Sequence, residues 1–212
     1  MLKDCAEICN RKTMGGLKSF KVNAGCMKIT GISGSPTAGG NNERIIELAL
    51  GIVEEKGYEI DKILLSKLKV LPCTDCGTCK TKKECPIDDD MAEIYETLET
   101  SDAFIVTSPV FFGSVSAQLK ALFGRTILLR RNGFLLKGKV GGSIAVGGSR
   151  NGGQEFTIQA IHAWMHIHGM LVVGDGAHFG GIAVKPVESD EVGLKTVKDT
   201  VNMICETLER FK

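Results

Sequence analysis

Four of the chain's eight cysteines lie within thirteen residues, in the stretch CTDCGTCKTKKEC at 73–85. Their spacing, C-x2-C-x2-C-x5-C, differs from structural zinc sites, which usually pair two ligands with two others a dozen or more residues away. Cysteines at successive intervals of three are instead typical of an iron–sulfur cluster. The pattern predicts one 4Fe–4S cluster, with zinc or free thiols as the alternatives, on the ligands Cys73, Cys76, Cys79 and Cys85.

The fourth cysteine lies two residues further along than in the bacterial ferredoxin run C-x2-C-x2-C-x3-C-P, where it serves a second cluster. Here Cys85 is also followed by a proline, Pro86, and the globular part of the chain has no second set of four cysteines. Cys85 therefore most simply completes the same cluster. The lysines within 75–90 would offset thiolate charge or dock an acidic redox partner, although a solvated loop is the simpler interpretation for each of them.

The composition of the chain indicates its class of protein and excludes some classes of partner. The chain has 212 residues, a net charge of +1, 43% hydrophobic and 6% aromatic residues, which suits one soluble α/β domain. This balance favours neither a nucleic acid nor a membrane surface as partner, and no apolar run is long enough to cross a bilayer. Because the first residues lack a secretory signal, we expect a cytoplasmic protein, whose clustered cysteines bind metal or act as redox thiols rather than form disulfides.

Strands and helices that alternate from Met27 onward must position the cysteines. Apolar runs predict strands at 27–33, 58–65, 102–110, 140–148 and 170–176, and helical patterns fall within 42–57, 88–100, 114–130, 153–169 and 190–212. This alternation predicts an α/β fold with a doubly wound parallel sheet of five strands in the flavodoxin-like order 2-1-3-4-5. The cysteine-rich insertion at 72–90 follows the second strand, so we expect it at the same edge of the sheet as the ligand loops.

The chain divides into an N-terminal extension, 1–26, and one domain, 27–212. The extension has no clear period, and Met27 is a candidate alternative start. It contains three further cysteines, Cys5, Cys9 and Cys26. Cys5 and Cys9 would share a face if the extension were helical, but incidental thiols are a simpler explanation than a second metal site, because further ligands are missing.

Ligands of open α/β sheets bind at the carboxyl ends of the strands, where the strand order reverses. The loop after the first strand, SGSPTAGGNN (33–42), offers hydroxyls and amides and leads into a helix N-terminus, which suits a phosphate. It has neither the lysine of a P-loop nor G-x-G-x-x-G, so the monoester phosphate of FMN fits better than a nucleoside triphosphate or a dinucleotide. An ordinary polar loop is the alternative. The candidate ligands are Ser33, Ser35, Thr37, Asn41 and Asn42.

The loops after the third and fourth strands fit the same cofactor. In SPVFFGSVS (108–116), apolar residues stand where a flat ring needs cover: Pro109, Val110, Phe111, Phe112 and Gly113. Two adjacent aromatic residues point in different directions, so a core position for both is the weaker alternative. In GGSRNGGQE (147–155), glycines let backbone N–H groups approach a ligand, and an arginine would face an anionic ring or phosphate unless it is simply solvated. The candidates there are Gly148, Arg150, Gly152 and Gly153.

The stretches ITGISGSPTAGGNN, TSPVFFGSVSAQLKALFGR and GGSRNGGQE resemble the NADPH-dependent FMN reductase-like flavoproteins over almost all of 27–212. With the compact cysteines added, the chain resembles the archaeal-type iron–sulfur flavoproteins. This resemblance implies FMN and a 4Fe–4S cluster that pass electrons between a ferredoxin-like donor and an acceptor such as oxygen, peroxide or another protein. It also implies a homodimer or homotetramer in which the cluster of one subunit lies near the flavin of another. The extension at 1–26 departs from the family pattern.

Two other functions are consistent with the residues. In the first, hydride transfer from NAD(P)H makes the protein an FMN or quinone reductase, and the cysteines hold a structural metal or only shape a loop. In the second, the protein is a non-catalytic redox sensor, although no partner-binding module is visible. No acid–base residue stands out. His162 and His166 share a helix face, but they and His168 more simply pack or lie at the surface than bind a ligand.

Overall fold

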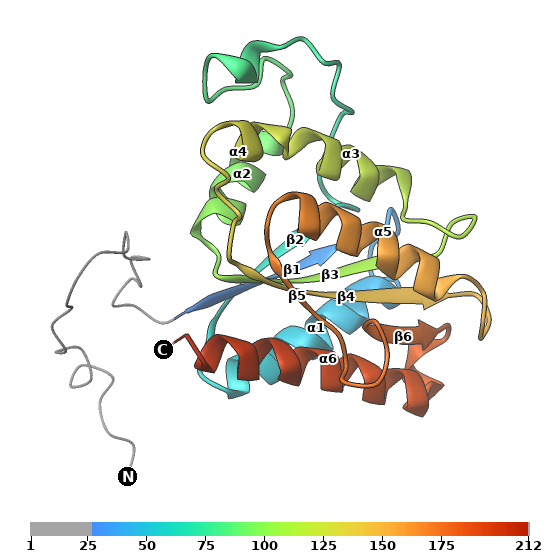
Figure 1. The fold of residues 1–212 in the computed structure, drawn as a ribbon. Coiled ribbons are helices and arrows are strands. Elements are labelled where there is room, and N and C mark those ends of the chain that lie inside the picture. Colours follow the sequence, from blue (N-terminus) through green and yellow to red (C-terminus); the bar gives the residue numbers. More distant parts are fainter. Residues whose placement is uncertain (1–26, 212) are drawn as a thin grey trace, which may run out of the picture.

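The computed structural model describes residues 27–211. These residues form a parallel β-sheet with helices on both faces (Figure 1). The predicted extension at 1–26, with Cys5, Cys9 and Cys26, lies outside the described residues, as does the last residue of the chain. No helix between residues 27 and 211 is long and apolar enough to cross a membrane.

Five strands lie in the order β2-β1-β3-β4-β5, which confirms the predicted flavodoxin-like topology. Neighbouring strands are parallel. Strands β3 and β4 are buried along almost their whole length because helices cover both faces, which explains their nearly continuous apolar sequence. The strands are β1 (Lys28–Ser33), β2 (Glu59–Leu64), β3 (Ala103–Pro109), β4 (Val140–Gly147) and β5 (Leu171–Val173).

A sixth strand, β6 (Gly181–Val184), was not predicted from the sequence. The first half of β4 pairs with β5 and the second half pairs with β6, both in parallel. The fifth strand predicted at 170–176 is therefore shortened to three residues, because the chain leaves the sheet at 174–180 before it returns as β6. A run of only four residues gives too little periodicity to be recognised as a strand.

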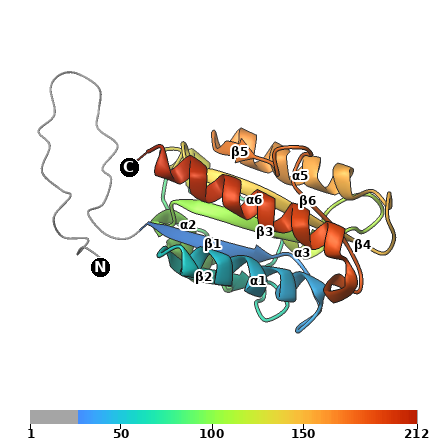
Figure 2. The same cartoon turned by 90° about the horizontal axis from the view of Figure 1, so that it is seen from below.

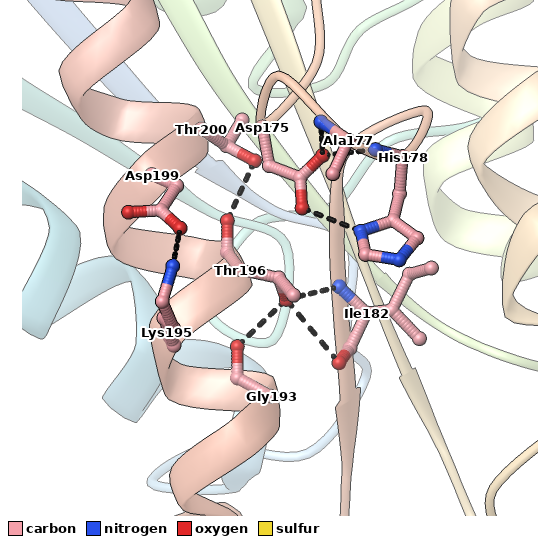
Figure 3. A network of polar contacts seen from close by, with 9 residues as sticks. All are labelled: Asp175, Ala177, His178, Ile182, Gly193, Lys195, Thr196, Asp199 and Thr200. Carbon is pink, nitrogen blue, oxygen red and sulfur yellow. Dashed lines mark hydrogen bonds and ion pairs between the residues drawn. The ribbon is translucent and has the colours of Figure 1, made fainter.

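Polar contacts fix β6 and the loop before it (Figure 3). Asp175 accepts a hydrogen bond from Ala177 N at 3.0 Å, and its other carboxylate oxygen lies 2.7 Å from His178 Nδ1. Burial alone would raise the pKa of Asp175, but the hydrogen bonds from His178 and Ala177 outweigh it and lower that pKa. On the adjacent helix α6 (Glu191–Glu209), Thr196 Oγ1 accepts a hydrogen bond from Ile182 N at 2.9 Å, which ties β6 to α6.

Two helical layers enclose the sheet. Helices α1 (Asn41–Glu55) and α6 cover one face (Figure 2). The other face carries α2 (Met91–Thr100), α3 (Ala117–Arg125), α4 (Ile127–Arg131) and α5 (Gln154–Ile167). Each face buries its own apolar core between helices and sheet.

The single helix predicted within 114–130 is divided at Thr126 into α3 and α4. The Thr126 hydroxyl donates a hydrogen bond to Phe123 O at 2.7 Å and accepts one from Trp164 Nε1 at 2.9 Å. A threonine hydroxyl that bonds to a carbonyl of the preceding turn competes with regular helical hydrogen bonding, which explains the break. Together α3 and α4 form the platform that carries the cysteine segment.

Candidate functional site

The three predicted cofactor loops lie together at the carboxyl edge of the sheet (Figure 1). The first loop is tied to β3 and to the start of α3. Gly34 N donates a hydrogen bond to Thr107 O at 2.8 Å, and the Ser116 hydroxyl donates one to Gly34 O. A side chain at Gly34 would come within 2.9 Å of Thr107 O, so only glycine allows this close approach.

The second loop contacts both β4 and the third loop. Val110 N donates a hydrogen bond to Val146 O at 3.0 Å. A Cβ atom on Gly153 would lie 3.2 Å from Gly113 Cα and 3.5 Å from Val110 Cγ1. The topology therefore places side by side three loops that the sequence predicts separately.

Two buried oxygens of the first loop lack a hydrogen-bond partner among the described residues, Ser33 Oγ and Asn42 Oδ1. Ser33 ends β1 and Asn42 lies in the first turn of α1, so they flank the helix N-terminus with its unpaired backbone N–H groups. Buried polar atoms almost always have a partner, and an unpaired one calls for an explanation. The Ser33 hydroxyl can donate to a phosphate, and Asn42 Oδ1 can accept from a water bound to that phosphate, so both atoms fit the phosphate of FMN at this helix N-terminus.

The other three candidates of the first loop are placed differently. Ser35 Oγ accepts a hydrogen bond from Thr37 N at 3.1 Å and so shapes the turn. Thr37 itself is exposed at the crest of the loop. Asn41 Oδ1 accepts a hydrogen bond from Val187 N at 3.0 Å, which connects the loop to the segment after β6.

The second loop ends in a tight turn whose central residues both have positive φ angles, +50° at Phe112 and +72° at Gly113. Phe111 and Ser114 exchange backbone hydrogen bonds of 2.9 and 3.1 Å around them, so the turn is of type I′. The left-handed region costs a residue other than glycine about 1–2 kcal/mol. Phe112 is fully exposed and Phe111 is 49% exposed, so neither is a core residue. A strained, exposed aromatic residue at this edge fits the predicted cover of a flat ring.

The third loop is closed by Gln154, a buried residue that the sequence does not single out. Its amide nitrogen donates to Ser149 O at 2.7 Å, and its amide oxygen accepts from Gly152 N at 2.8 Å. Gly148 remains exposed. The guanidinium of Arg150 pairs with Asp190, the N-cap residue of α6, so this predicted cofactor ligand is engaged by a carboxylate of its own chain.

The cysteine segment, which we define as residues 71–90, follows β2 but does not stay at the carboxyl edge. It runs along the outer side of α2, α3 and α4, where it projects above α4 (Figure 1). A one-turn helix within it, η2 (Thr78–Lys80), contacts α4. The expectation that the cysteines share an edge with the cofactor loops is therefore wrong, because the connection is long enough to cross the helical layer.

A buried ion pair holds both ends of the cysteine segment. Asp89 and Arg125 form two hydrogen bonds of 2.6 and 3.0 Å, with side chains 0% and 1% exposed. Leu71 N donates to Asp89 at 2.8 Å, and Leu71 O accepts from Arg125 at 2.9 Å. Burial alone would raise the pKa of Asp89, but the hydrogen bonds from Arg125 and from backbone N–H groups lower it. Since Leu71 precedes the first cysteine of the segment and Asp89 follows the last, this pair closes the segment at its base.

The four cysteines of the segment form no disulfide within the described residues, and all of them line one cavity together with Arg131. Cys73 and Cys76 are exposed. Cys76 Sγ lies 3.5 Å from Thr78 Oγ1, and this contact with Thr78 lowers the pKa of the Cys76 thiol. Arg131 Nη1 donates a hydrogen bond to Cys79 Sγ at 3.1 Å. The lowered pKa of Cys76 favours its thiolate, the form in which cysteine binds metal.

Four cysteines that line one cavity are a donor set that suits an iron–sulfur cluster. Within residues 27–211, no three side chains of histidine, cysteine, aspartate or glutamate come close enough together to hold one metal ion. In a 4Fe–4S cluster each thiolate binds a different iron, so four cysteines spread around a cavity are suitable. The cavity measures about 20 Å³, the space of one or two waters, so a multi-atom group would also occupy its open side. A cleft of about 470 Å³ between the segment and α2 reaches Cys85 from the other direction.

His162 of α5 and His168, which follows α5, contact neighbouring side chains, in line with the simpler interpretation of the sequence. His168 is buried, with Nε2 2.9 Å from Thr126 Oγ1, and burial lowers the pKa of His168 to about 4. His162 Nε2 lies 2.7 Å from Ser143 Oγ. Neither ring lies in the cofactor loops or in the cysteine segment.

Comparison with known proteins shows the family to which the chain belongs. The family model described as NADPH-dependent FMN reductase matches residues 27–183. An iron–sulfur flavoprotein of Methanosarcina thermophila is 57% identical over 183 residues, which are 86% of this chain and 96% of that protein. The chain belongs to the iron–sulfur flavoproteins of the NADPH-dependent FMN reductase family. An iron–sulfur flavoprotein of Methanocaldococcus jannaschii is 45% identical over 193 residues, 88% of this chain and 100% of that protein.

Solved structures of lower identity share the fold. An NADH:FMN oxidoreductase in its apo form superposes with a TM-score of 0.66 at 18% identity, over 85% of this chain and 89% of that one. A flavodoxin from the domain Archaea gives a TM-score of 0.57 at 19% identity, over 86% and 99% of the two chains. Membership of this family makes the protein a flavin-dependent oxidoreductase.

Several residues that shape the two sites were not predicted. Glu43, in the first turn of α1, accepts hydrogen bonds from Gly39 N at 2.7 Å and from the Ser66 hydroxyl, and so braces the first loop from inside. An acid shortly after a helix start is a sequence signal for such a contact. Arg125 gave no such signal, because a buried arginine on a helix has the same sequence pattern as a solvated one.

Proposed function

We propose that the protein carries FMN at the carboxyl edge of its sheet and a 4Fe–4S cluster in the cysteine segment. It would transfer electrons between a ferredoxin-like donor and an acceptor such as oxygen, peroxide or another protein. The observation that carries this proposal is the placement of four cysteines around one cavity, in a segment closed by a buried ion pair. When bound, the two groups would join one-electron chemistry at the cluster to one- or two-electron chemistry at the flavin. The names of the relatives support the same pair of cofactors.

On the flavin side, Ser33 and the N-terminus of α1 would donate hydrogen bonds to the phosphate. Asn42 would accept one from a water bound to it, because its unpaired atom is the amide oxygen Oδ1. Phe112, whose side chain is fully exposed in the second loop, would shield the flavin ring from water. Gly153 lets the second and third loops close around the ring, because a side chain there would meet Gly113.

On the cluster side, Cys73, Cys76, Cys79 and Cys85 would be the ligands, and Asp89 with Arg125 would keep the segment in shape. The exposure of Cys73 and Cys76 gives an electron carrier a short path to the cluster. Helices α3 and α4 separate the cysteine segment from the cofactor loops of the same chain (Figure 1). This separation supports a homodimer or homotetramer in which the cluster of one subunit serves the flavin of another. We place the protein in the cytoplasm, where exposed thiols stay reduced.

The first test is the cofactor content of anaerobically purified protein. We expect about four iron and four sulfide per chain together with FMN, and a large loss of iron but not of flavin in Cys76→Ser. Cys205→Ala is the matched control, because Cys205 is buried in α6 on the opposite face of the sheet, and its iron content should not change. One zinc per chain without sulfide would overturn the cluster assignment.

The family description favours a second candidate, an NADPH-dependent reductase in which the cysteine segment is structural. Stopped-flow reduction by NAD(P)H and by reduced ferredoxin separates the two. Faster flavin reduction by ferredoxin, lost in Cys76→Ser, supports electron entry through the cluster. Rapid reduction by NAD(P)H that is unchanged in Cys76→Ser supports the reductase.

A further inference from the structure

Two arginines line the cavity of the four cysteines, and their charges are placed differently. Arg125 is buried and neutralised by Asp89. Arg131, the last residue of α4, is exposed, and no carboxylate of residues 27–211 lies within ion-pair distance of it. Its polar contact is the hydrogen bond from Nη1 to Cys79 Sγ at 3.1 Å.

Asn132, the residue after Arg131, also holds Cys79, through its main chain. Asn132 Nδ2 donates hydrogen bonds to Cys79 O at 3.3 Å and to Leu128 O at 2.8 Å. The main chain of Cys79 is thus fastened to the end of α4, beside the guanidinium of Arg131. The contact between arginine and sulfur therefore depends on a second, independent anchor and not only on a long flexible side chain.

Of the three lysines in the cysteine segment, Lys80, Lys82 and Lys83, the last two are paired with carboxylates. Lys83 contacts Glu99 at 2.6 Å, and Lys82 lies 3.3 Å from Glu84. The carboxylates of Asp75 and Glu84 also line the cavity. No hydrogen bond joins Lys80 to a sulfur within residues 27–211, so Arg131 is the described cation that contacts a cysteine sulfur directly.

We propose that Arg131 is a positioning residue that raises the reduction potential of the cluster through its hydrogen bond to Cys79. The inference rests on the proposed function. One electron from the external donor adds negative charge to a group that four thiolates already make anionic, and no bond is broken. A charge-assisted hydrogen bond to sulfur stabilises the more negative state, and such bonds are among the determinants of cluster potentials.

The experiment measures the midpoint potential of the cluster by anaerobic spectroelectrochemistry in wild type, Arg131→Gln and Arg131→Lys. We expect Arg131→Gln to shift the potential to a more negative value, by roughly tenfold in the one-electron equilibrium constant, about 59 mV. Arg131→Lys should shift it less, because the charge remains while the planar donor geometry is lost. The difference between wild type and Arg131→Gln should shrink at high salt, since Arg131 is exposed.

Arg130→Gln is the matched control. It removes the same charge one residue away, but Arg130 donates to Ile167 O at 2.8 Å and stacks over Phe134 at 4.8 Å, so it does not contact the cysteines. Its potential should stay close to that of wild type.

The possible outcomes test the inference about Arg131 and the proposed function separately. An Arg131→Gln protein with full iron content and an unchanged potential would overturn the inference while leaving the proposed function intact. If Arg131→Gln fails to retain iron, the comparison moves to Arg131→Lys, where a potential equal to that of wild type would also overturn it. Wild-type protein without iron and sulfide would instead overturn the proposed function.

Discussion

The cofactor loops and the cysteine segment are held by different kinds of structure. Each cofactor loop directly continues a strand, and short backbone hydrogen bonds join it to the neighbouring strand, as between Gly34 and Thr107. The cysteine segment lies outside the sheet. Its regular secondary structure within 71–90 is a single helical turn. Its base is closed by a single buried ion pair, Asp89–Arg125, between residues far apart in sequence.

This difference shows how the fold divides the two tasks. The cofactor loops inherit their positions from the parallel sheet, so the sequence locates them well. The cysteine segment depends on a few side-chain contacts with α3 and α4, so its position is a property of the tertiary structure. We therefore expect variants in one region to affect that region's cofactor much more than the other's.

The largest effect is expected for Asp89→Asn. This change leaves the Arg125 charge buried without its partner, and removing one member of a buried pair costs about 3–5 kcal/mol. The free energy of unfolding, measured by urea denaturation, should fall by that amount. Iron should be lost at urea concentrations at which FMN is still bound.

Asp90→Asn is the control for this prediction. Asp90 is exposed and accepts a hydrogen bond from Lys69 N at 2.6 Å, which an asparagine oxygen also accepts. A change within about 0.5 kcal/mol is expected, as for most surface substitutions. Simultaneous loss of iron and FMN in Asp89→Asn would contradict the comparison, since the two regions would then unfold as one unit.

A smaller effect is expected for Gly34→Ala, on the flavin side. The new Cβ would lie 2.8 Å from Leu119 Cδ2 and 2.9 Å from Thr107 O, so the first loop must shift. Overpacking of this kind costs about 1–3 kcal/mol. FMN affinity, measured by fluorescence titration of the flavin-free protein, should fall while iron content stays constant.

Gly51→Ala tests whether the effect belongs to the loop. Gly51 lies within α1 and a Cβ there meets nothing within 4 Å, so alanine should raise stability by about 0.5–1 kcal/mol. If both alanine variants bind FMN like wild type, the role given to the first loop is wrong.

The smallest effect is expected for Phe112→Gly. Glycine relieves the positive φ at this position, so stability should rise by up to about 1 kcal/mol, because the exposed ring packs against nothing in its own chain. FMN affinity should fall, since the ring would lose its cover.

Phe134→Gly is the matched control, with φ at +54° and a ring stacked on Arg130. It should leave FMN affinity unchanged. An equal loss of affinity in both variants would indicate an indirect effect of the backbone rather than a contact of Phe112 with the flavin.

Much of the fold was predictable from particular segments. Strand β3 has a continuous apolar sequence, and its buried position in the middle of the sheet follows from that. Strand β6 escaped prediction because four residues give little pattern and its pairing depends on the loop at 174–180. The break between α3 and α4 escaped it because the hydrogen bonds of Thr126 involve Trp164, which lies on another helix.

The sequence by itself determined the chemistry of both sites: the four cysteines, their spacing, and the polar and aromatic loops that end three strands. Local spacing fixes these features, since neighbouring residues in a chain stay close in any fold. Only the tertiary structure decided that the cysteine segment crosses α3 and α4, that Arg125 is buried against Asp89, and that Arg131 rather than Arg130 meets Cys79. These contacts join residues 36 to 52 positions apart, and no local pattern specifies which distant side chain fills a given position.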